Sequence, residues 1–141
     1  MRILFSIIVV FSLFSCQSPK EEEEKKEYEV YQYSEMALYM NSIYEIHETL
    51  KKDILEGNKL SDTIPEAFLK IHTADFTKGF ERDDHFESFS EFYLQQVTAI
   101  YDTASAVPLK DRYNNAINMC ISCHQTVCMG PIPRIKKLLI N

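Results

Sequence analysis

Residues 108–130 read PLKDRYNNAINMCISCHQTVCMG and have the signals of one amphipathic helix. A proline stands where the first helical turn begins, and Gly130-Pro131 prevents the helix from continuing. Between these limits one face recurs at steps of three and four residues: Tyr113, Ala116, Ile117, Cys120, Cys123, His124 and Val127. The pattern predicts a helix that turns two cysteines and a histidine toward the protein core.

Residues 120–124 read CISCH, which has the spacing C-x-x-C-H. Side chains three and four residues apart lie on one helical face, so both thiols and the imidazole can reach a single porphyrin. We therefore expect one covalently attached haem c, held by thioether bonds to Cys120 and Cys123. His124 is expected to bind the iron through Nε2 as the proximal ligand, while its Nδ1 proton is donated to an acceptor that fixes the ring.

Two other roles for these side chains stay open from the residues alone. Cys120 and Cys123 could form a disulfide, although such a bond is strained on a regular helix. Both cysteines and His124 could also join Cys128 in a zinc site. Eight residues of helix rise about 12 Å, whereas zinc ligands lie within roughly 2.3 Å of the metal, so this site requires the helix to end early.

Three preceding segments also have helical periodicity. The first ends at Gly57, the second runs from a capping box at residues 63–66 to about Gly79, and the third runs from a similar cap at residues 84–87 to about Ser105. Their apolar faces are, in order, Tyr33, Met36, Met40, Ile43, His47, Leu50 and Ile54; Phe68, Ile71, His72 and Phe76; and Phe86, Phe89, Tyr93, Val97, Ile100 and Ala104. No segment alternates convincingly as a strand does.

Each of the four amphipathic helices needs a partner to bury its apolar face. We predict an all-α fold, an antiparallel four-helix bundle over residues 30–130 with a covalently attached haem on the last helix. Residues 131–141 are expected to form a basic C-terminal tail. Its cations, Arg134, Lys136 and Lys137, either fold back to pair with the haem propionates or stay solvated.

The first sixteen residues predict export from the cytoplasm. A positively charged start precedes an apolar run that ends at Leu13-Phe14-Ser15-Cys16. This run is shorter than a membrane-spanning helix normally requires. The segment resembles a bacterial lipoprotein signal, which implies cleavage before a lipidated Cys16, although Phe14 departs from the usual small residue. An ordinary signal peptide or an uncleaved anchor is the alternative. Residues 17–29, rich in Glu and Lys, are expected to be an acidic tether.

Charge and composition exclude several classes of function. A net charge of −6 leaves no basic stripe for phosphates, so we expect no nucleic-acid partner. No carboxylate pair, nucleophile dyad or glycine-rich phosphate loop is recognisable, so we do not expect an enzyme.

The layout of residues 31–128 resembles the class II c-type cytochromes, the cytochrome c′ group and its methionine-ligated low-spin relatives. Those proteins have the haem motif near the C-terminus of a four-helix bundle, as at residues 120–124 here. The resemblance implies that helix one approaches the distal face of the haem. It also implies that Met40, seventeen residues before Gly57, is a distal iron ligand. A basic residue often follows the histidine in that family, whereas Gln125-Thr126-Val127 follows here.

Several distal arrangements remain open. Met40 either ligates the iron, where a thioether favours the ferrous state, or is an ordinary core residue against the porphyrin. Met36 lies one turn earlier, and His47 lies seven residues later on the same stripe. An open, five-coordinate iron is the remaining possibility. Cys128 is either a buried small hydrophobe near the haem edge or a reactive thiol.

The leading functional hypothesis is a monohaem c-type cytochrome that transfers single electrons at the envelope of a Gram-negative bacterium. Its partners would be redox proteins at the membrane surface and, through the lipid anchor, the membrane itself, on the periplasmic side or at the outer membrane. The resemblance adds a possible homodimer. A five-coordinate iron would instead indicate a gas-binding module for NO or CO, and a chain without a cofactor would be a structural lipoprotein.

Overall fold

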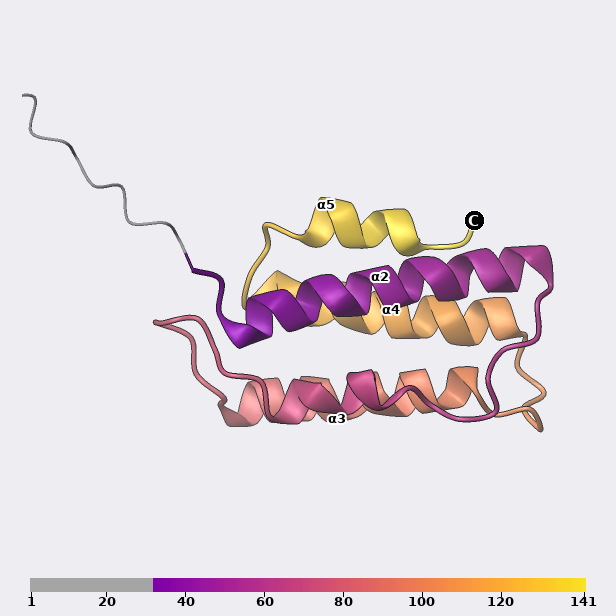
Figure 1. The fold of residues 1–141 in the computed structure, drawn as a ribbon, viewed down its shortest axis with the longest axis horizontal. Coiled ribbons are helices and arrows are strands. Elements are labelled where there is room, and N and C mark those ends of the chain that lie inside the picture. The colour runs from indigo at the N-terminus through magenta and orange to yellow at the C-terminus, as the bar shows by residue number, and fades with distance from the viewer. Residues whose placement is uncertain (1–31) are drawn as a thin grey trace, which may run out of the picture. The chain divides into compact units, whose positions relative to one another are not determined.

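Every regular element is a helix within residues 32–141, the part of the chain that the computed structural model describes. The α-helices, labelled as in Figure 1, are α2 (Glu35–Glu56), α3 (Asp84–Ile100), α4 (Leu109–Thr126) and α5 (Ile132–Ile135). Two 3₁₀ helices, η2 (Glu66–His72) and η3 (Lys136–Leu138), complete the set. The all-α prediction is confirmed for these residues.

The predictions for the N-terminal segment lie outside the described residues. They are the signal peptide over residues 1–16, lipid attachment at Cys16 and the acidic tether over residues 17–29. Among the helices of residues 32–141, none combines the length and apolarity that a membrane crossing requires.

Both ends of α2 follow from local chemistry. Ser34 lies before the first turn, and its hydroxyl accepts a hydrogen bond from the Ala37 N–H at 3.1 Å. At the other end Gly57 takes a left-handed conformation with φ of 71°, which a glycine adopts without steric cost. The Asn58 N–H then donates to the Asp53 carbonyl at 2.9 Å. The predicted end of this helix at Gly57 is confirmed.

The second predicted helix is wrong in length and type. Only the seven-residue η2 forms, Pro65 lies at its N-terminal end, and no side chain caps it, so the predicted capping box at residues 63–66 is absent. Hydrogen bonds from elsewhere occupy the carbonyls that a longer α-helix would use. Tyr39 Oη donates to the Phe68 carbonyl at 2.9 Å, and the Arg82 guanidinium donates to the carbonyls of Ile71 and Ala74.

The predicted antiparallel four-helix bundle is not confirmed, because only three long helices form within residues 32–141. Residues 57–83 return alongside α3 after α2 (Figure 1), and α3 and α4 then run antiparallel across a short connection. Asp83, one residue before the predicted cap, starts α3 by accepting from the Phe86 N–H at 2.8 Å. Pro108 precedes α4 as predicted, but α4 ends at Thr126, before Gly130.

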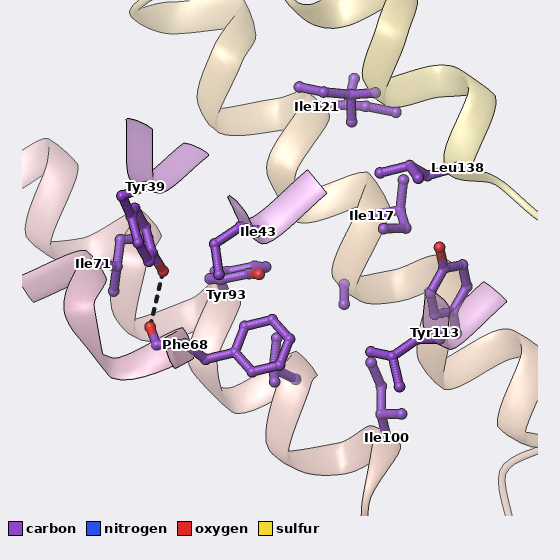
Figure 2. Packing of buried hydrophobic residues seen from close by; sticks show 14 of the residues in the cluster. Tyr39, Ile43, Phe68, Ile71, Tyr93, Ile100, Tyr113, Ile117, Ile121 and Leu138 are labelled. Atoms are coloured by element: carbon purple, nitrogen blue, oxygen red, sulfur yellow. Dashed lines mark hydrogen bonds between the residues drawn. The ribbon is translucent and has the colours of Figure 1, made fainter. Parts of the chain in front are cut away.

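One apolar core joins the three long helices to η2, and Figure 2 shows part of its packing. Phe68, Tyr113 and Ile117 have no exposed surface. The three buried tyrosine hydroxyls all have partners. Tyr39 donates to the Phe68 carbonyl at 2.9 Å, as Figure 2 shows, and Tyr113 donates to the His47 carbonyl at 2.9 Å. Tyr93 Oη lies 2.8 Å from His47 Nε2. Hydrogen bonding of this kind removes the cost of burying a phenol.

The C-terminal segment, residues 131–141, is folded rather than solvated. Ile135, Leu138 and Ile140 are buried, and α5 and η3 pack against α2 and α4. The Lys51 ammonium donates to the carbonyls of residues 137 and 139, at 2.9 and 2.8 Å. Asn114 exchanges two hydrogen bonds with the backbone of Ile140. These contacts hold the segment beside α2, with the C-terminus near Lys51.

Candidate functional site

A cavity of about 560 Å³ lies among α2, α3, α4 and the C-terminal segment. This volume falls in the range of about 300–1,000 Å³ typical of small-molecule and cofactor sites. The wall is mainly apolar and aromatic, with Tyr39, Ile43, Tyr44, Phe86, Phe89 and Tyr93 among its residues. Such a lining suits a large, flat, apolar ligand.

The cavity wall contains all three residues of the C-x-x-C-H motif. Cys120, Cys123 and His124 lie in the last two turns of α4, and each is only partly exposed. Cys120 and Cys123 are free thiols, so the alternative of a disulfide between them is not formed. Burial, together with the nearby Cys123 thiol, raises the pKa of Cys120 to about 12, and burial also raises the pKa of Cys123. Both sulfurs are therefore protonated, neutral thiols at ordinary pH.

The orientation of the His124 ring fixes which nitrogen is available. His124 Nδ1 lies 2.9 Å from the backbone carbonyl oxygen of Cys128. A carbonyl can only accept, so Nδ1 must carry the proton and donate it. The lone pair of the ring is then on Nε2, the tautomer that a metal-binding histidine needs.

This acceptor exists because α4 ends shortly after the motif. The Val127 and Cys128 N–H groups close the last turn on the carbonyls of Cys123 and His124, at 3.3 and 3.2 Å. The turn brings the Cys128 carbonyl back to the imidazole. The exposed Cys128 thiol also lines the cavity, so Cys128 is not the buried hydrophobe considered from the sequence.

The set of donors fits a haem better than a bare metal ion. Within residues 32–141, no three His, Cys, Asp or Glu side chains converge where a metal ion could be held. The zinc arrangement with Cys128 therefore has no counterpart there. A haem brings four nitrogen ligands of its own and needs from the protein one imidazole and, in a c-type site, two thiols. Cys120, Cys123 and His124 supply these groups.

The candidate distal residues lie on α2 and also line the cavity. Met36 is buried and Met40 is partly buried, and both thioethers lie on the wall one turn apart. His47 lies deeper, with 1% of its surface exposed, and its Nε2 is 2.8 Å from Tyr93 Oη. Ligation through that nitrogen would break the bond to Tyr93, whereas His47 Nδ1 has no hydrogen-bond partner among the described residues. Met36, Met40 and His47 therefore all remain candidates for the distal position.

His47 is expected to make the protein less stable in acid. Burial disfavours the charged ring and lowers the pKa of His47 from 6.5 to about 4. As the pH falls, the His47 ring therefore takes up a proton near pH 6.5 in the unfolded chain but only near pH 4 in the folded chain. The stability that depends on the neutral ring is fully present above pH 6.5 and falls by about 3 kcal/mol as the pH approaches 4.

Urea unfolding at pH 7 and pH 4 checks this prediction. His47→Gln retains an amide for Tyr93 but does not titrate, so it should lose about 3 kcal/mol less than the unmodified protein on acidification. His85→Gln, which alters an exposed histidine, serves as the matched control and should lose as much as the unmodified protein. Equal losses in all three proteins would contradict the assignment.

One part of the site was not visible in the sequence, and a second was left open by it. The Cys128 carbonyl is a backbone group, and only the turn after Thr126 places it beside His124. Arg134 lines the cavity because the C-terminal segment folds back. The spacing of Ile132, Ile135 and Leu138 was the signal for that packing, since these residues recur every three positions.

Comparisons with protein-family models, with curated proteins and with solved structures find no match in any of the three.

Proposed function

We propose that this protein is a monohaem c-type cytochrome that transfers single electrons. The observation that carries the proposal is the site around His124. Its Nδ1 proton is donated to the Cys128 carbonyl, its Nε2 is free to bind iron, and Cys120 and Cys123 lie on the same apolar cavity. A thiol pair for covalent attachment and a correctly protonated imidazole are what a c-type haem requires.

Each residue has a distinct task in this proposal. Cys120 and Cys123 would hold a haem through thioether bonds, and His124 Nε2 would bind its iron. By resemblance to the methionine-ligated relatives, the Met40 thioether would be a second iron ligand, with Met36 as the neighbouring candidate. The apolar and aromatic wall would favour the less charged, reduced state. The haem itself supplies a one-electron couple.

The wider assignment is part of the same proposal. The chain would be a class II-like cytochrome in which residues 57–83 replace the second helix of the four-helix bundle. Lipidation at Cys16 would tether it at the envelope of a Gram-negative bacterium, where it meets redox partner proteins. Two copies of the chain would pair through α2, as members of that family often do through their first helices.

Absorption spectra of protein produced with a haem-attachment system test the function. We expect a red protein whose colour stays with the polypeptide after acid extraction, and a low-spin spectrum in both oxidation states. A colourless protein, or haem that is extracted completely, would refute the cytochrome. A high-spin spectrum that binds CO readily would refute methionine ligation and support the gas-binding alternative.

A further inference from the structure

Arg134 is the only Lys, Arg, Asp or Glu residue on the cavity wall within the described part of the chain. The other titratable groups there are histidines, tyrosines and cysteines. A single guanidinium on a largely apolar wall provides a localised positive charge. Guanidinium groups bind carboxylates strongly because their N–H donors match the two oxygens.

Two contacts with α2 hold Arg134 in place. Its guanidinium carbon lies 3.8 Å from the centroid of the Tyr44 ring, a stacked cation–π arrangement. Its Nη1 donates to Asn41 Oδ1 at 2.8 Å. Tyr44 and Asn41 also line the cavity. These two contacts hold the exposed side chain of Arg134 against the wall.

Most donors of Arg134 are still available. A guanidinium has five N–H groups, and the structure shows one of them bonded, to Asn41. Within residues 32–141, no carboxylate lies within ion-pair distance of Arg134. The cation is positioned but lacks an anion, and a ligand in the cavity can supply one.

We propose that Arg134 is the residue that binds the haem propionates. This inference rests on the proposed function, because the carboxylates belong to the haem. In class II cytochromes a basic residue often follows the histidine. Here Arg134, from the C-terminal segment, would take that role. Lys136 and Lys137, the other cations of that segment, do not line the cavity, so they do not share this role.

Potentiometric titration of the haem-loaded protein tests the proposal with three variants. Arg134→Gln removes the charge, Arg134→Lys keeps it without the planar fork, and Lys136→Gln removes an equal charge two residues away. A nearby cation favours the added electron, so Arg134→Gln should lower the reduction potential. Arg134→Lys should recover most of the difference, and Lys136→Gln should match the unmodified protein.

The pH dependence provides a second measurement. Without the guanidinium, the propionates should titrate at higher pH, so the region in which the potential rises on acidification should move upward in Arg134→Gln alone. Loss of haem from Arg134→Gln, with the other two variants fully loaded, would also support the proposal.

Three results would overturn it. Equal potentials in Arg134→Gln, Lys136→Gln and the unmodified protein would show that Arg134 does not meet the propionates. Equal falls in Arg134→Gln and Arg134→Lys would show that Arg134 acts by packing α5 against Tyr44. Absence of covalent haem from the unmodified protein would refute the proposed function, and this inference with it, and is recognised before any variant is made.

Discussion

Replacing Cys120 and Cys123 together with serine is expected to abolish covalent haem completely. Serine is nearly the same size as cysteine and preserves α4, but its hydroxyl does not form the thioether that holds a c-type haem. On a denaturing gel stained for haem, the unmodified protein should give a band and the double variant none. Each single variant should retain haem through one bond only.

Cys128→Ser is the matched control for this experiment. Cys128 lines the same cavity, but the group that touches His124 is its backbone carbonyl, which the substitution leaves unchanged. The variant should carry a full complement of haem. Loss of haem from Cys128→Ser, or its retention in the double variant, would contradict the assignment of the two attachment residues.

Met40→Ala is expected to convert the iron fully from low-spin to high-spin. Alanine is too short to reach the iron, so the sixth position opens and CO binds readily. Met40 and Met36 lie one turn apart on α2 and both line the cavity, so Met36→Ala is the natural comparison. It should remain low-spin. Absorption spectra of both variants in the oxidised and reduced states provide the measurement.

The opposite pattern would assign the ligand to Met36. A spectrum that stays low-spin in both variants would mean that neither methionine binds, and would point to His47, whose Nδ1 has no hydrogen-bond partner among the described residues. A high-spin spectrum already present in the unmodified protein would exclude a methionine ligand and make the distal side an open gas pocket.

The sequence predicted helix ends most accurately where the residue at the end acts only on its own helix. Gly57 ends α2 through its own backbone conformation, and Pro108 precedes α4 as predicted. The second helix was predicted with the wrong length and type because side chains distant in the sequence determine where it ends. Tyr39 and Arg82 take carbonyls in and after η2, and neither contact can be read from the pattern of residues 63–79.

The candidate site divides in the same way. Cys120, Cys123 and His124 follow from their spacing on one helix, and the structure brings them to one cavity with Met36 and Met40 from α2. The acceptor for His124 was expected, but its identity depends on where α4 ends. Arg134 was one of three cations that could fold back, and only the burial of Ile135 and Leu138 selects it.

Mass spectrometry of one tryptic peptide tests the central claim most directly. Cleavage after Arg112 and Arg134 releases residues 113–134, which contain Cys120, Cys123 and Cys128 and no other Lys or Arg. After treatment with a thiol-alkylating reagent, we predict that this peptide carries the added mass of one haem and a single alkyl group, on Cys128. A peptide without the haem mass and with all three cysteines alkylated would contradict the account.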